Sequence, residues 1–186
     1  IKESSTGLIK ALADTVEKVN PAVQFGLVCD SVWANSSTVE SGSATSDDFE
    51  MYTDGYVDLP TIMTISNVNT ILVKLPGSLT NKQIPFKTTL SWWKNFASQY
   101  GADVCSLIYN SKLSTDERGW SSPDQVLQQL IAMRDVKAKG AAFASYKHIE
   151  ANNDGHSKLI EGYFKGSVKA SDVLTTLTLV FEDVAH

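Results

Sequence analysis

The chain has 186 residues, of which 42% are hydrophobic and 20% are charged, a balance typical of one domain that buries a core. Its formal net charge is −5, and its 16 Lys and Arg residues are scattered singly, which argues against a nucleic-acid-binding protein. No apolar run approaches the roughly 20 residues of a membrane-spanning helix, so we expect no membrane span.

Apolar periodicity predicts helices that alternate with short apolar runs. The predicted helices cover residues 6–20, 47–66 (as one or two stretches), 86–100 and 122–139. The apolar runs, which predict strands, cover residues 23–29, 70–75, 103–109 and 140–146. On the first helix, Leu8, Leu12, Val16 and Val19 share one face, and Asn20-Pro21 ends it. Residues 173–181 fit a helix or a strand.

Four apolar runs separated by helices predict an α/β fold with a parallel sheet. Two architectures fit this order, namely a doubly wound open sheet and a portion of a (β/α)8 barrel. No Gly-x-Gly-x-x-Gly sequence follows any of the runs, which weakens the dinucleotide-binding option. A flavodoxin-like domain also fits the order of the elements.

Polar side chains follow each predicted strand, and in parallel α/β proteins the carboxyl ends of the strands face one crevice. We therefore expect a binding site that includes Asp30, Lys74, Tyr109, Asn110, Tyr146 and Lys147. Asp30 is the one carboxylate directly at a strand end. It is either a general acid, whose pKa the nearby Trp33 would help to raise, or a loop residue that caps a turn. Lys74 either reaches into the crevice or pairs with Asp30.

Two tryptophans, Trp33 and Trp120, lie in loops that follow predicted strands. Each is either a platform on which a sugar ring stacks or a residue that closes the mouth of the barrel by hydrophobic contacts. The pair Trp92-Trp93 lies on a predicted helix, where packing against the sheet is the expected role.

The sequence indicates no metal, no cofactor and no serine nucleophile. Cys29 and Cys105 lie inside apolar runs, which predicts buried and unreactive thiols, and no His residues cluster with them to form a zinc site. His148 and His156 lack the partners of a catalytic triad, and a Gly-x-Ser-x-Gly elbow is absent from the sequence.

Several of these segments resemble, in the same order, the family-10 glycosylhydrolase-like proteins. Residues 20–35 are similar to the family's P-x-V-x-F-G…W segment, and residues 68–74 to its x-D-Y-I-x-P-Q strand. Trp92-Trp93 matches a Trp pair in the helix that follows, and residues 140–146 resemble the last strand, G-x-x-x-F-S-Y. Asn69 and Lys74 stand where the family pattern has Asp and Gln. The most similar branch belongs to clostridial cell-wall and surface-layer proteins.

The resemblance implies that residues 1–165 form the C-terminal half of a TIM-type (β/α)8 barrel, with residues 166–186 as an extension. It implies an extracellular, cell-wall-associated protein that cleaves polysaccharide, such as the glycan strands of peptidoglycan, by hydrolysis or lytic transglycosylation. A non-catalytic carbohydrate-binding or surface-layer module is the alternative. The chain opens without Met or a signal-peptide pattern, so we expect a processed product or a fragment. Since half a barrel leaves open sheet edges, its expected partner is an N-terminal half or a second copy.

Overall fold

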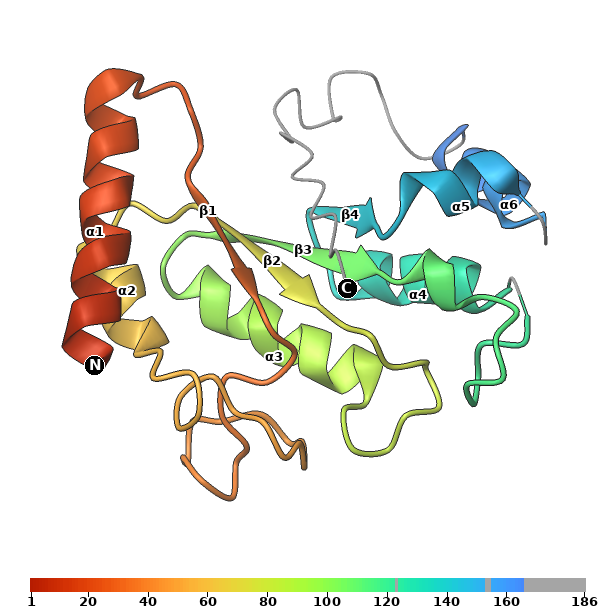
Figure 1. The fold of residues 1–186 in the computed structure, drawn as a ribbon, viewed down its shortest axis with the longest axis horizontal. Coiled ribbons are helices and arrows are strands. Elements are labelled where there is room, and N and C mark those ends of the chain that lie inside the picture. The colour runs from red at the N-terminus through yellow and green to blue at the C-terminus, as the bar shows by residue number, and fades with distance from the viewer. Residues whose placement is uncertain (123, 153–154, 166–186) are drawn as a thin grey trace.

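The computed structural model describes residues 1–122, 124–152 and 155–165, which form one sheet with two helices packed against one face and further helices around it (Figure 1). The sheet consists of the strands β1 (Gly26–Cys29), β2 (Thr70–Lys74), β3 (Asp103–Ile108) and β4 (Gly140–Phe143). The helices are α1 (Lys2–Val19), α2 (Leu59–Ile65), α3 (Phe86–Ser98), α4 (Asp124–Asp135), α5 (Tyr146–Ala151) and α6 (His156–Lys165), and a 3-10 turn covers Asn110–Lys112.

All four strands are parallel, and their order in the sheet, β1-β2-β3-β4, is their order along the chain. A doubly wound sheet reverses its strand order at a switch point, whereas a barrel adds each strand beside the previous one. The described strands show no reversal. The predicted α/β class with parallel β/α units is therefore confirmed, and the architecture is that of a partial TIM-type barrel.

The two faces of the sheet have different environments. Helices α3 and α4 lie on one face of the sheet (Figure 1). Along β2 burial alternates, and the side chains of Ile71 and Val73 are fully buried. On the opposite face, Val28 of β1 remains 56% exposed and its neighbour Leu72 is only partly buried. Helices on one side and an accessible apolar face on the other are the arrangement of a barrel wall, whose inner face meets the other strands of the barrel.

The local sequence explains the burial of one side of α3 and the start of α2. Leu90, Trp93 and Ala97 of α3 are all fully buried. Helix α2 begins where the side chain of Asp58 accepts a hydrogen bond from the backbone N–H of Thr61 (3.3 Å), the usual arrangement of an acidic N-cap.

Several predicted boundaries are wrong. Helix α1 begins at Lys2, not at Thr6, and β1 begins at Gly26, not at Val23. Helix is confined to Leu59–Ile65 within residues 47–66, because the preceding residues are held in an ordered loop by Glu50. The last helix of the barrel wall ends at Asp135, not near Lys139, since the backbone N–H of Lys139 already bonds to Val104 of β3 (2.6 Å). The fourth strand ends at Phe143, not at Tyr146, where α5 begins.

The apolar face of α1 lies in solvent. Leu8 is 62% exposed and Leu12 is 49% exposed, while the buried residues of this helix are Thr6 and Ala13. The amphipathic pattern is present as predicted, but the described residues do not cover it. Residues 166–186, including the segment 173–181, lie outside the described residues. No helix in the described ranges is long and apolar enough to cross a membrane.

Both thiols are free and buried, as the sequence predicted. Burial, together with the negative charge of Asp30, raises the pKa of the Cys29 thiol to about 12. Burial, together with Asp103, raises the pKa of Cys105 to about 11. Both thiols therefore stay protonated near neutral pH and are poor nucleophiles.

The raised pKa of Cys29 predicts a pH dependence of folding stability. Above the ordinary thiol pKa of 9.0 the unfolded chain loses a proton that the folded chain retains, so the free energy of unfolding falls as the pH rises from about 9 toward 12. We expect Cys29→Ala to remove this contribution. In urea unfolding at pH 8, 9 and 10, the stability advantage of the wild type over the variant should shrink as the pH rises. Parallel pH curves for the two proteins would contradict the prediction.

Candidate functional site

The carboxyl ends of β1 and β2 bring Asp30 and Lys74 together. The Lys74 ammonium lies 3.6 Å from Asp30 Oδ1, and both side chains are partly accessible, 35% for Lys74 and 50% for Asp30. This is the pairing that the sequence offered as one of two roles for Lys74. Because the pair is solvated, it contributes only about 0–1 kcal/mol to stability, which leaves both groups available to a ligand.

Ser31 joins the two strand ends beneath this ion pair. Its hydroxyl donates to the carbonyl of Lys74 (2.7 Å), and its own carbonyl accepts a hydrogen bond from Trp93 Nε1 of α3 (2.8 Å). Ser31 is buried, so both bonds are shielded from water. The carboxyl end of β1 is therefore fixed to β2 and to helix α3.

Trp33 is buried within an aromatic cluster and is not an open platform. Its ring stacks on Trp92 with centroids 6.1 Å apart, and Trp92 stacks in turn on Phe96 at 5.3 Å. The indole N–H of Trp33 donates to the carbonyl of Val57 (3.0 Å). These contacts favour the packing role among the two that the sequence left open for Trp33.

Asn110 links the ends of β3 and β4. Its side-chain Nδ2 donates to the carbonyl of Ser145 (3.2 Å) and lies 3.3 Å from Nε2 of His156 at the start of α6. Both Asn110 and His156 are buried. Ser145 Oγ in turn lies 2.9 Å from Nδ1 of His148. Asn110 thus holds the strand ends in place, and Tyr109 beside it is half-buried.

The accessible residues at the end of β4 are Tyr146 and Lys147, in the first turn of α5. Tyr146 is 58% exposed and Lys147 is also exposed, so an aromatic ring and an ammonium are presented to solvent beyond the strand. Trp120, in contrast, is 1% exposed and lies in the wall of a pocket between the loops that follow β2 and β3.

A buried carboxylate that the sequence analysis did not single out organises the loop after β1. Glu50 accepts hydrogen bonds from the backbone N–H of Asn35 (3.0 Å), from Asn35 Nδ2 (2.8 Å) and from the hydroxyl of Thr38 (2.7 Å). No local sequence pattern signals this role, because the donors precede Glu50 by more than ten residues. The network shapes the loop that carries Trp33.

The described strand ends suit the binding of a polar ligand better than hydrolysis by this chain alone. Glycosidases need two carboxyl groups on either side of the scissile bond. Asp30 provides one at a strand end, whereas Glu50 is buried with its oxygens occupied and Glu117 lies further out in the loop that follows β3. The described residues contain no cluster of His, Cys, Asp and Glu that could hold a metal ion.

Two comparisons relate this architecture to glycosidases. No family model matches the chain. It is 22% identical over 153 residues to the Glycosyl hydrolase YngK of Bacillus subtilis (strain 168), covering 81% of this chain and 30% of that protein. A structure from Bacteroides thetaiotaomicron VPI-5482, named a "putative alpha-L-fucosidase", matches with a TM-score of 0.55 at 11% identity, over 86% of this chain and 50% of that one. The fold is therefore glycosidase-like, and the chain spans half or less of either protein.

The hydrogen bonds of Glu50 predict that the stability of the loop after β1 depends on the carboxylate of this residue. In Glu50→Gln, one carboxylate oxygen becomes an amide that faces the N–H donors of Asn35, so we expect a loss of about 1–3 kcal/mol in the free energy of unfolding. Glu40→Gln is the matched control, because Glu40 is an exposed residue of the same loop, and it should stay within about 0.5 kcal/mol of the wild type. Urea unfolding measures both, and equal midpoints for the two variants would contradict the role of Glu50.

Proposed function

We propose that this chain is part of an extracellular, cell-wall-associated enzyme that cleaves polysaccharide, with the glycan strands of peptidoglycan as substrate. The observation that carries the proposal is the sequence similarity to a glycosyl hydrolase over 153 residues, in a chain whose parallel strand ends present a carboxylate beside an ammonium. The bond would be broken by hydrolysis or by lytic transglycosylation. The family-10 and clostridial features of the sequence resemblance support the same choice of substrate.

Within this proposal, Asp30 is the carboxyl group that acts on the glycosidic oxygen, and Lys74 orients it. The exposed Tyr146 and Lys147 contact the glycan at the end of β4. Tyr109, Asn110, Trp33 and Trp120 form the supporting walls, because they are buried or half-buried. The second carboxyl group would come from β/α units other than the four described here.

A non-catalytic carbohydrate-binding or surface-layer module is the second candidate. The observation that favours it is the single accessible carboxylate at the described strand ends, already paired with Lys74. Incubating the longer parent protein with purified peptidoglycan, followed by mass spectrometry, separates the two. Reducing ends indicate hydrolysis, anhydro-sugar ends indicate transglycosylation, and binding without products supports the module.

We propose that further β/α units of the same barrel cover both the open face of the sheet and the exposed apolar face of α1. The exposed apolar residues of α1 and β1 support this, as does the match over only half of the structural relative. We expect this chain alone to self-associate, and Leu8→Asp with Leu12→Asp to reduce that association. Size-exclusion chromatography with light scattering measures it. A monodisperse wild-type monomer that unfolds cooperatively would count against the proposal.

The role of Asp30 predicts the effect of one substitution on the parent enzyme. Asp30→Asn removes the proton-transferring carboxyl group and should lower turnover of glycan about 100-fold or more. Asp14→Asn is the matched control, because Asp14 also pairs with a lysine, Lys10, but lies on α1. Its turnover should equal that of the wild type. Unchanged turnover in Asp30→Asn would remove Asp30 from the catalytic residues.

A further inference from the structure

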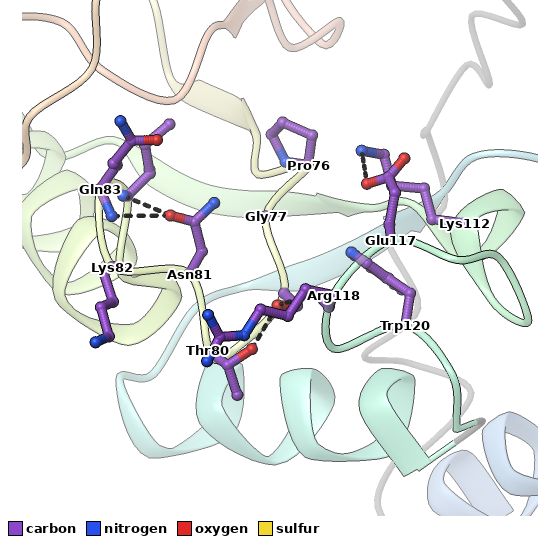
Figure 2. A pocket seen from close by; sticks show the side chains of 12 residues that line it. Pro76, Gly77, Thr80, Asn81, Lys82, Gln83, Lys112, Glu117, Arg118 and Trp120 are labelled. Carbon is purple, nitrogen blue, oxygen red and sulfur yellow. Dashed lines mark hydrogen bonds and ion pairs between the residues drawn. The ribbon is translucent and has the colours of Figure 1, made fainter.

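A pocket of about 380 Å³ lies between the loop that follows β2 and the loop that follows β3 (Figure 2). Its size falls within the roughly 300–1,000 Å³ of small-molecule sites. It lies beyond the carboxyl ends of the strands, where ligands bind in parallel α/β folds. None of the roles assigned to the strand ends uses this pocket, apart from the wall position of Trp120.

The two loops are fixed to one another, so the pocket has a defined shape. The hydroxyl of Ser78 donates to the carbonyl of Arg118 (3.0 Å), and Gln129 Nε2 of α4 donates to the carbonyl of Gly77 (3.2 Å). Gly119 adopts a φ of +88°, and a Cβ placed there would lie 2.4 Å from Ser78 Oγ. The loops thus approach as closely as a glycine permits.

Asn81 presents an amide donor on the wall of this pocket. Its Oδ1 accepts hydrogen bonds from the backbone N–H groups of Gln83 (2.9 Å) and Ile84 (3.0 Å), which fixes the orientation of the amide. The opposite atom, Nδ2, is therefore directed toward Gly77 and the pocket (Figure 2). In the same view the indole nitrogen of Trp120 points inward from the other side.

The charges of the pocket are unlike those of the chain as a whole. Lys82, Lys112 and Arg118 line it together with one acid, Glu117, whose carboxylate is paired with Lys112. The lining is therefore net positive in a chain with a net charge of −5. In a chain that is acidic overall, a pocket lined by cations and N–H donors favours the binding of an anion that has several hydrogen-bond acceptors.

We propose that this pocket binds a sugar residue that carries a carboxylate. The proposal rests on the proposed glycan-cleaving function and adds that a free carboxylate on one sugar of the strand is recognised in this pocket. The guanidinium of Arg118 is suited to hold a carboxylate through two parallel hydrogen bonds, and the amide of Asn81 donates to the same sugar. The carboxylate belongs either to a uronic acid or to the lactyl ether of an N-acetylmuramic acid residue.

The test compares binding of glycans to the intact chain by isothermal titration calorimetry. The probes are oligosaccharides that contain glucuronate, oligosaccharides that contain N-acetylmuramic acid, and neutral N-acetylglucosamine oligomers of equal length. We expect at least one carboxylated probe to bind about tenfold more tightly than the neutral oligomer, with an advantage that falls as salt is raised. The preferred acid identifies the source of the carboxylate.

Two variants and one control test whether the preference for carboxylated glycans arises at this pocket. Arg118→Gln and Asn81→Asp should each abolish the advantage of the carboxylated probe. Asn81→Asp keeps the oxygen that accepts from Gln83 and Ile84, so an unchanged melting temperature confirms that its fold is intact. Lys18→Gln removes an exposed cation of α1 and should bind as the wild type does.

The outcomes separate this proposal from the one on which it rests. Equal binding of neutral and carboxylated glycans, unaffected by Arg118→Gln, overturns the acidic-sugar pocket and leaves the glycan function standing. Binding of glucuronate itself, lost in Arg118→Gln, without binding of any oligosaccharide supports the pocket and overturns the glycan function. Binding of none of the probes overturns the pocket, and the product analysis described above then decides the glycan function by itself.

Discussion

The in-register parallel pairing of four consecutive strands is the constraint on which the rest of the molecule depends. Since every strand runs the same way, Cys29, Lys74 and Ile108 all end their strands at one edge of the sheet. Every loop that follows a strand must then leave from that edge. The ion pair of Asp30, the Ser31 junction and the pocket wall at Trp120 are consequences of this geometry, not independent features.

Much of the framework follows from local patterns in the sequence. Short apolar runs mark the positions of all four strands, and the spacing of Leu90, Trp93 and Ala97 indicates the buried face of α3. The region before Leu59 could not be predicted in this way. Its shape depends on the carboxylate of Glu50 meeting donors from Asn35 and Thr38, and contacts between residues this far apart leave no periodicity.

In the candidate site, too, some features could be predicted from local sequence and others could not. Neighbouring strand ends could be placed from the sequence, so Asp30 and Lys74 were expected near one another, and they are. The solvent exposure of these side chains could not be predicted, because it depends on residues from elsewhere in the chain that pack against them. Trp33 lies beneath Trp92, a residue of α3, and Asn110 lies against His156, a residue of α6. A polar or aromatic residue after a strand thus indicates a location, while its accessibility is a property of the tertiary fold.

The order of the strands also has a kinetic consequence. Each strand pairs with the next strand along the chain, but a helix and its loops separate the two, so Gly26 pairs with Thr70 and Cys105 pairs with Gly140. Pairing of this kind is non-local, because a long loop has to close before the strand contacts form, and we expect the parallel sheet to fold slowly for its size. Each completed strand is then the template on which the next one pairs.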